Sequence, residues 1–159
     1  MPEFSGRLRP VGRVALLVSR YNEMVTGRLL EGARQCCAEA GIAAADVDVF
    51  WVAGAFELPT LAEALARSAR YRCLVALGAV IRGDTPHFEY VAGEAARGLA
   101  AVARSHALPV GFGLLTVENL DQALDRAGGK AGNKGYEAAD AALRAADLVD
   151  QLRDHADQG

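Results

Sequence analysis

The chain has 159 residues, 52% of them hydrophobic and 23% charged, which is the composition of one folded domain with its own core. Its formal net charge is −3 and the sequence has no basic block, which argues against a nucleic-acid partner. No run approaches the roughly 18 apolar residues of a membrane span, and residues 1–10 lack the apolar centre of a signal peptide. We therefore expect one soluble, cytoplasmic domain over residues 1–159.

The three cysteines, Cys36, Cys37 and Cys73, are predicted to be free thiols in the core. Neighbours in sequence rarely bridge to each other, and an odd count suits a reducing compartment. Their spacing does not match that of zinc ligands, so no metal site is predicted.

Short apolar runs alternate with longer amphipathic stretches along the chain. Strands are predicted over residues 13–18, 47–52, 73–81 and 110–116. Helices are predicted over residues 23–40, 58–69, 86–105, 120–127 and 133–151. Alternation of this kind with right-handed crossovers gives a parallel sheet with helices on both faces, a three-layer α/β sandwich.

Both ends of the chain are expected to lie outside this sandwich. Residues 1–12 lack periodicity and are predicted to form an arm that adds to a neighbouring subunit's sheet. Residues 152–159 are predicted to form a C-terminal tail that frays from about residue 155.

Each predicted strand is followed by a cluster of polar or aromatic residues. The clusters are residues 19–23, 54–59, 82–88 and 116–119. Ligands of open parallel sheets bind beyond the carboxyl ends of the strands. Four clusters at one edge of one sheet therefore predict a binding site there.

The third cluster has the signature of an anion site. Thr85 is a good N-cap and Pro86 suits the first helical position, so a helix should begin here and present free N–H groups. Gly83 permits close approach of the backbone to a ligand, and His87 would lie in the first turn beside the anion. The alternative is an ordinary capped helix with a surface histidine.

Four further residues have a functional and a structural interpretation. Arg126 would be a second partner for the anion, or a solvated helix residue. Tyr21 and Phe56 would offer an aromatic surface to a planar heterocycle, or belong to the core. Glu57 would accept hydrogen bonds from ligand hydroxyls, or stabilise the start of a helix, and both roles are compatible.

Residues 127–135 hold four glycines and two lysines. They lack the G-x-x-x-x-G-K-[ST] motif, because Lys134 is followed by Gly135, and no strand precedes them, which excludes a nucleotide-triphosphatase loop. We predict a flexible hinge between two helices, from which Lys134 can reach a ligand.

Five segments together resemble the 6,7-dimethyl-8-ribityllumazine synthase family. They are SRYNEMVTGRLLEGA, WVAGAFELP, LGAVIRGDTPHFEYV, PVGFGLLTVENLDQALDRAG and KAGNKGYEAA. They occur in the family's order and extend over residues 13–150, and the second and third are highly specific.

The resemblance implies a flavodoxin-like fold with a four-stranded parallel sheet and active sites between neighbours in a pentamer. It implies condensation of 5-amino-6-(D-ribitylamino)uracil with 3,4-dihydroxy-2-butanone 4-phosphate, the penultimate step of riboflavin biosynthesis, without a cofactor. The short KAGNKG connection resembles family members that build shells of twelve pentamers, so pentamer and shell both stay open. Riboflavin synthase is a further partner that the resemblance raises.

The resemblance also implies residue roles. His87 would move protons. The residues that would bind the ribitylaminouracil are Tyr21, Asn22, Ala55, Phe56, Glu57, Ala79, Val80, Ile81, Phe112 and Lys134, with Phe112 supplied by the adjacent subunit. The residues that would hold the phosphate are Gly83, Asp84, Thr85 and Arg126. Tyr21 stands where the family usually has Phe or Trp.

Three other functions compete with this one. An archaeal-type riboflavin synthase would dismutate the lumazine, and a non-catalytic flavin-binding shell protein would keep the fold without turnover. A flavodoxin-like electron carrier needs Thr, Ser and Gly in its first loop, whereas this loop reads SRYNEMVTG.

Overall fold

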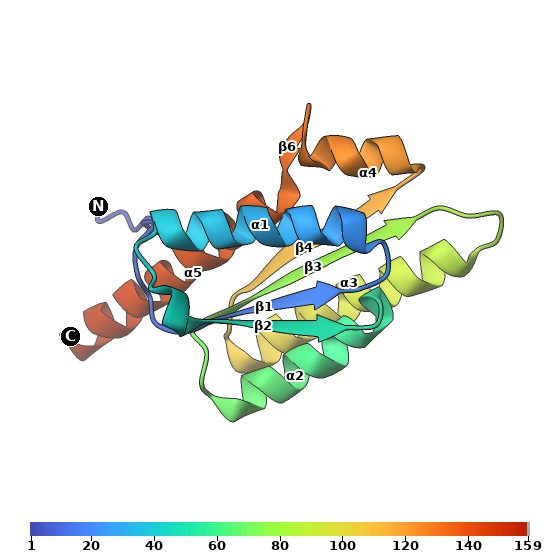
Figure 1. The fold of residues 1–159 in the computed structure, drawn as a ribbon. Helices are drawn as coiled ribbons and strands as arrows, with labels where there is room; N and C mark the ends of the chain where they lie inside the picture. The colour runs from blue at the N-terminus through green and yellow to red at the C-terminus, as the bar shows by residue number, and fades with distance from the viewer. Residues whose placement is uncertain (159) are drawn as a thin grey trace.

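A four-stranded parallel sheet with helices on both faces forms the body of the protein in the computed structural model, which describes residues 1–158 (Figure 1). The strands are β1 (Val14–Ser19), β2 (Val47–Val52), β3 (Cys73–Ile81) and β4 (Val110–Val117), in the spatial order β2-β1-β3-β4. The helices are α1 (Glu23–Glu39), α2 (Leu58–Ser68), α3 (His87–His106), α4 (Leu120–Arg126) and α5 (Lys134–Asp157), with 3₁₀ turns η1 (Ala44–Asp46) and η2 (Ala55–Glu57). The predicted flavodoxin-like sandwich is confirmed.

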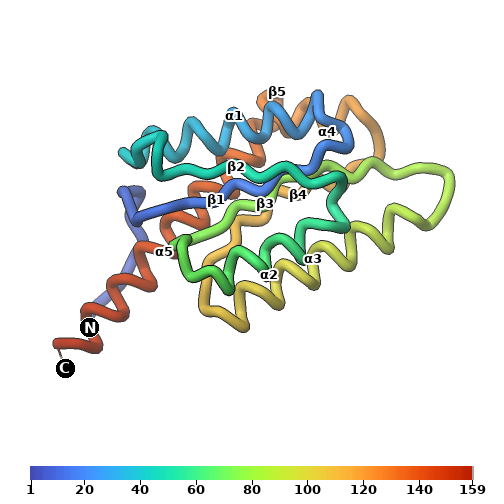
Figure 2. Tube along the Cα trace, turned by 60° about the horizontal axis from the view of Figure 1, so that its bottom comes forward, coloured from blue at the N-terminus to red at the C-terminus, as the bar shows by residue number. Residues whose placement is uncertain are grey.

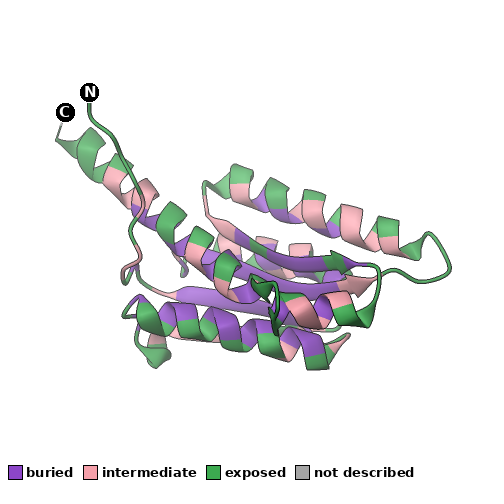
Figure 3. Cartoon of the chain, turned by 90° about the horizontal axis from the view of Figure 1, so that it is seen from above, coloured by how far each residue is buried: buried purple, intermediate pink, exposed green. Residues whose placement is uncertain are grey.

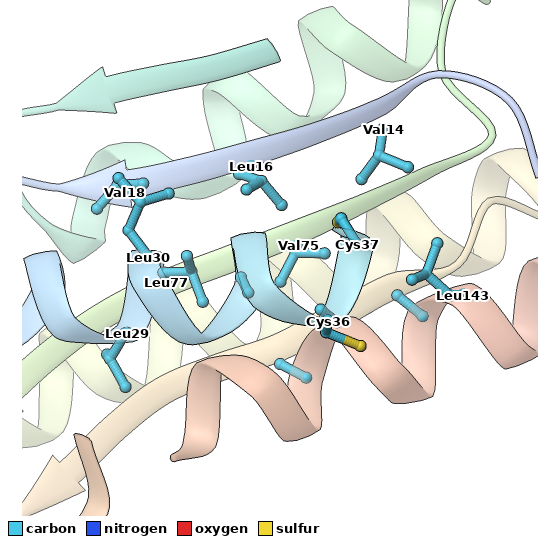
Figure 4. Packing of buried hydrophobic residues seen from close by; sticks show 14 of the residues in the cluster. Val14, Leu16, Val18, Leu29, Leu30, Cys36, Cys37, Val75, Leu77 and Leu143 are labelled. Carbon is cyan, nitrogen blue, oxygen red and sulfur yellow. The ribbon is translucent and has the colours of Figure 1, made fainter. Parts of the chain in front are cut away.

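The sheet separates two apolar clusters. Helices α1, α4 and α5 cover one face and α2 and α3 cover the other (Figures 1 and 2). Strand β3 is an inner strand and its residues from Cys73 to Ala79 are all buried, as is the whole of β1, so these two strands are the most enclosed elements of the chain (Figure 3). On the α1 and α5 face, the packed side chains include Leu16, Val18, Leu29, Val75, Leu77 and Leu143 (Figure 4).

Small residues allow α5 to lie directly on strand β4. A Cβ on Gly111 would collide with the backbone of Ala138, and one on Gly113 would lie 2.7 Å from a methyl group of Leu77. Because the sequence is poor in aromatics, mainly aliphatic side chains separate the layers. Close packing of this kind is the main source of cohesion in such a core.

The three cysteines lie in this core as free thiols, as predicted. Burial raises the pKa of Cys36 to about 12 and that of Cys37 to about 11, and it raises the pKa of Cys73 as well. Thiols that stay protonated in this way are unreactive at neutral pH.

The boundaries of two elements differ from the prediction. Helix α3 begins at His87, because Pro86 takes a non-helical conformation (φ −70°, ψ 3°) and occupies the position before the first turn. The N-cap assignment of Thr85 is therefore wrong, although its hydroxyl accepts a long hydrogen bond of 3.4 Å from the N–H of His87. The predicted hinge at residues 127–135 is instead a small antiparallel hairpin of β5 (Ala127–Gly129) and β6 (Gly132–Asn133).

The predicted C-terminal tail is mostly helical. Helix α5 continues to Asp157, and Gly159 lies outside the described residues. The chain's first residues pack against this end: the ring of Phe4 meets that of His155 edge-on at 5.2 Å, and Gln151 donates to the carbonyl of Ser5 at 2.8 Å. These contacts support helical turns that the sequence predicted to fray.

The N-terminal arm is anchored to α5 by a buried carboxylate, and both chain ends lie at the same end of the molecule (Figures 1 and 2). Asp147 is 1% exposed. It accepts hydrogen bonds from the N–H of Arg7 at 2.7 Å, from the amide of Gln151 at 2.8 Å and from Arg9, which also pairs with Asp150. Burial raises the pKa of Asp147, but these hydrogen bonds lower it by more, to about 2. The addition of the arm to a neighbour's sheet stays a prediction.

Within residues 1–158, no helix combines the length and the apolar character needed to cross a membrane.

Asp147→Asn should lower the free energy of unfolding by about 2 kcal/mol at pH 7, the range for hydrogen bonds to a buried charged group. The pKa of Asp147 is depressed in the folded state, so its contribution is present above its ordinary pKa near 3.8 and is lost as the pH falls towards 2. Urea unfolding followed by circular dichroism should thus separate variant and wild type at pH 7 and bring them together near pH 2. Asp154→Asn, at an exposed position of the same helix, is the control and should change neither curve.

Candidate functional site

An open cavity of about 730 Å³ lies at the carboxyl edge of the sheet, where the loops after β1, β2 and β3 meet. Ten of the predicted site residues line it: Tyr21, Ala55, Phe56, Glu57, Ala79, Val80, Ile81, Gly83, Thr85 and His87. Five lining residues had no predicted role: Gly54 and Phe88, which belong to the predicted clusters 54–59 and 82–88, and Ala53, Tyr90 and Val91, which lie outside the clusters. Phe88, Tyr90 and Val91 follow His87 in helix α3, so the anion-site signature pointed to their helix but not to their contact with the cavity.

Aromatic side chains stand open at this cavity. Tyr21 is 74% exposed and Phe56 is 58% exposed, so the alternative that they belong to the core is wrong for the single chain. Tyr90, on α3, is exposed at the same cavity. Exposed aromatic rings around an open cavity are suited to stacking on a flat ligand.

The loop after β1 is tied to the neighbouring strands. The N–H of Tyr21 donates to the carbonyl of Ala53 at 3.0 Å. Asn22 takes a left-handed conformation (φ 63°), which Asn tolerates better than most residues, and its amide nitrogen donates to the carbonyl of Ala79 at 3.2 Å. Asn22 does not line the cavity in the single chain, and its NH₂ group is engaged within the protein.

The loop after β2 closes on itself through Glu57. Its carboxylate accepts the N–H of Gly54 at 3.0 Å, while its own N–H donates to the carbonyl of Gly54 at 3.3 Å. Helix α2 then starts at Leu58, with Pro59 in its first turn. The carboxylate thus closes the 3₁₀ turn η2 and makes no capping hydrogen bond to α2, so the predicted stabilisation of that helix start stays a prediction. Glu57 also lines the cavity, which is compatible with a ligand-binding role.

Arg82 braces the loop after β3, a contribution that the sequence reasoning missed. Its guanidinium lies 4.5 Å from the ring centre of Phe88 and pairs with Glu118 at 3.0 Å and Glu89 at 3.5 Å. Its backbone N–H donates to the carbonyl of Val117 at 2.9 Å. The hydrogen bond to Glu118 raises the pKa of Arg82 above its usual value. These contacts connect the end of β4 with the start of α3 and frame the exposed loop that carries Asp84 and Thr85.

Three predicted site residues lie away from the cavity. Phe112 is on the edge strand β4, paired with Ala76 well before the carboxyl edge, and is 44% exposed. Arg126 ends α4, and its guanidinium donates to the carbonyl of Gln122 at 3.0 Å. Lys134 is the first residue of α5, directly after the hairpin in the chain. Asp84 is also absent from the lining, although both of its loop neighbours Gly83 and Thr85 are present.

Within one chain, the cavity thus combines an aromatic surface, an imidazole and the opening turn of a 20-residue helix. Such a helix start favours a negatively charged group because the helix dipole is positive there, although the N–H groups of His87 and Glu89 also bond to Thr85 and Pro86. The imidazole of His87 lies in that turn and lines the cavity. The arrangement is suited to bringing a flat heterocycle beside a small anion.

Residues 12–150 match the family model for 6,7-dimethyl-8-ribityllumazine synthase. A relative from Anaeromyxobacter sp. (strain Fw109-5), named 6,7-dimethyl-8-ribityllumazine synthase, is 52% identical over 150 residues, which cover 94% of this chain and 92% of the relative. With the parallel sheet and the loop residues in the order that the sequence predicts, these matches establish that the chain belongs to the 6,7-dimethyl-8-ribityllumazine synthase family.

Proposed function

We propose that this protein is a transferase that condenses 5-amino-6-(D-ribitylamino)uracil with 3,4-dihydroxy-2-butanone 4-phosphate. The products are 6,7-dimethyl-8-ribityllumazine, phosphate and water, and the reaction is the penultimate step of riboflavin biosynthesis. Family membership supports this reaction. The observation that carries it is a cavity that joins the exposed rings of Tyr21 and Phe56 to the helix start that bears His87.

The pyrimidine lies between aromatic rings in this proposal. Tyr21 stacks on one face, and Phe112 of a neighbouring subunit closes the other. The strand end formed by Ala79, Val80 and Ile81 presents backbone groups to the edge of the ring, and all three residues line the cavity.

The ribityl chain runs along the loop after β2. Ala55 and Phe56 line its path. Glu57 accepts hydrogen bonds from its hydroxyls, and Asn22 offers its amide oxygen, since its nitrogen is already engaged by Ala79. Lys134 from a neighbouring subunit lies near the polar end of the ligand.

The phosphate is held at the start of α3. Gly83, Asp84 and Thr85 surround it with backbone N–H groups and a hydroxyl, and the helix dipole favours its charge. Arg126 supplies a planar guanidinium that can form two parallel hydrogen bonds with phosphate oxygens.

The chemistry needs proton transfers and a stabilised leaving group. The amine adds to the ketone and water is lost to give an imine, phosphate is then eliminated, and ring closure with loss of a second water completes the lumazine. His87 moves protons between these steps, since an imidazole has one nitrogen that can donate a proton and one that can accept it. Arg126 and the helix start stabilise the departing phosphate. Much of the acceleration comes from holding two reactants together in a productive orientation.

The site needs a second subunit in this proposal. Phe112, Arg126 and Lys134 lie outside the cavity of their own chain, and Phe112 is exposed on an edge strand. A ring of five subunits, in which each chain lends these residues to its neighbour, completes every site. The buried free thiols fit a reducing compartment, and we infer that the enzyme works in the cytoplasm, where riboflavin synthase would consume its product.

His87→Ala should slow lumazine formation by roughly ten- to a hundred-fold, below the usual range for a general acid–base because the positioning of the reactants survives. The rate is measured from lumazine absorbance at saturating substrates. His106→Ala is the control: His106 lies at the other end of α3, bonded to Glu63 at 2.8 Å, and its loss should leave the rate within about twofold of wild type. Equal losses in both variants would contradict the role of His87. Formation of riboflavin when the protein is mixed with lumazine itself would identify a riboflavin synthase instead.

Arg126→Ala should raise the KM for the butanone phosphate by about tenfold or more, with a smaller change in the KM for the pyrimidine, because a charge-assisted phosphate contact is lost. Steady-state kinetics with each substrate varied in turn measure both constants. Arg97→Ala removes an exposed arginine that pairs with Glu94 at 2.5 Å, one turn away on the same helix, and it should leave both constants unchanged. An unaltered KM for the phosphate substrate in Arg126→Ala would sink the assignment.

Mixed oligomers test whether the site is shared. When His87→Ala and Arg126→Ala chains are unfolded, mixed in equal amounts and refolded together, about one quarter of the interfaces combine an intact His87 with an intact Arg126. Lumazine formation should then exceed the mean of the separate variants. No gain in activity would place both residues in one chain's site.

Light scattering on the wild type separates a pentamer from a sixty-subunit shell by mass.

A further inference from the structure

The position of Arg126 depends on how the hairpin that follows it is held. Arg126 is the last residue of α4, and Ala127 begins β5 directly after it. In the hairpin, Ala127 pairs with Asn133, the last residue of β6. The backbone of Asn133 is therefore paired with the residue next to Arg126. A contact that fixes Asn133 also fixes the backbone of Arg126.

The side chain of Asn133 attaches the hairpin to two helices. Its amide nitrogen donates to the carbonyl of Arg28 in α1 at 3.0 Å. Its amide oxygen accepts the N–H groups of Gly135 at 2.8 Å and Tyr136 at 3.1 Å, at the start of α5. One side-chain amide thus caps α5 and connects the hairpin to the backbone of a helix more than a hundred residues earlier in the chain.

Helix α1 has a recess for this amide. In an α-helix the carbonyl of residue 28 lies beside residue 32, one turn later, and residue 32 here is glycine. A Cβ on Gly32 would overlap the amide group of Asn133. Gly135 permits a similar approach, since a Cβ there would collide with the carbonyl of Leu29. The two glycines let the hairpin and the start of α5 lie directly on α1.

We propose that Asn133 is a positioning residue that sets Arg126 for the phosphate-bearing substrate. This inference rests on the proposed function, in which Arg126 holds the phosphate. Without the bond to Arg28, the hairpin still packs on α1 but loses the hydrogen bond that sets its place there. The guanidinium of Arg126 is then held less closely at its distance from the rest of the site. Misplacement of a binding group by about an ångström is enough to weaken a contact of this kind.

Two variants break the attachment without changing charge. Asn133→Ser keeps an oxygen that caps α5 but is too short to reach the carbonyl of Arg28. Gly32→Ala favours helix α1 intrinsically but fills the recess and displaces the amide of Asn133. If Gly32→Ala weakens phosphate binding although alanine favours the helix, the loss comes from displacement of Asn133 and not from a weakened helix. That result separates a positioning role from a merely structural one.

Each variant has a matched control. Gly27→Ala makes the same substitution in α1 where nothing lies within 4 Å of the new methyl group. Tyr136→Phe removes the 3.0 Å hydrogen bond from its hydroxyl to Glu39, a contact between α1 and α5 that does not involve the hairpin. Both controls should behave as wild type in every measurement below.

Steady-state kinetics and calorimetric titration with inorganic phosphate are the two measurements. Asn133→Ser and Gly32→Ala should each raise the KM for the butanone phosphate about tenfold while kcat changes by less than about threefold, and should weaken phosphate binding to a similar extent. In an Arg126→Ala background, neither change should have a further effect, because the group that they position is absent.

The outcomes separate this inference from the proposed function. If the wild type makes lumazine and Arg126→Ala weakens phosphate binding, but both attachment variants bind phosphate normally, Asn133 has no positioning role. If the wild type makes no lumazine, yet phosphate binding depends on Arg126 and on the attachment alike, the function falls and the positioning role stands. Should phosphate binding be indifferent to Arg126, the phosphate-binding role of Arg126 and the positioning role of Asn133 are both overturned, while lumazine formation by the wild type still decides the function. Gly32→Ala leaves Asn133 itself in place, so the test survives a failure of Asn133→Ser to fold.

Discussion

The burial of strand β3 on both faces is the constraint from which most of the architecture follows. A strand that is apolar from Cys73 to Ala79 must be covered on each side, and the parallel arrangement of its neighbours requires helical crossovers that supply this cover. The same arrangement ends all four strands at one edge. The loops after β1, β2 and β3 meet there because of the topology and not because of any attraction between them.

The site edge is open and the opposite end of the molecule is firmly held. At the site, aromatic rings are exposed and the loop after β3 extends beyond the sheet (Figures 1 and 3). At the other end, Asp147 anchors the N-terminal arm, and Tyr71 and Arg13 both bond to Asp48, at 2.7 Å and 2.8 Å. The hydrogen bond from Tyr71 is the first cause of the lowered pKa of Asp48. These contacts lie far from the cavity, whereas Asn22, Glu57 and Arg82 brace the loops at the site edge itself.

Small residues decide which segments can approach each other. Gly111 and Gly113 admit α5 to the sheet, and Gly32 and Gly135 admit the hairpin to α1. These four positions lie on three different elements. A Cβ would collide with the backbone of a neighbouring element at Gly111 and Gly135, and with a neighbouring side chain at Gly113 and Gly32. A substrate group as small as phosphate needs cationic partners at fixed distances, and close backbone contacts provide such distances without many long side chains.

The sequence by itself determined the parallel sandwich, the edge that carries the site and the family. Periodicity placed the four strands and five helices, because apolar residues repeat at the spacing of the face that each element buries. Local rules placed the helix start at His87 within one residue, the error arising from the conformation of Pro86.

Only the tertiary structure decided the long-range contacts. Residues 127–135 are a hairpin and not a hinge, because Asn133 reaches an α1 carbonyl that sequence distance conceals. The end of α5 is helical because the arm lies against it, and Arg82 braces its loop through Glu118, 36 residues away. Helical and strand periodicity is a property of neighbours along the chain, whereas these contacts depend on where distant segments come to rest.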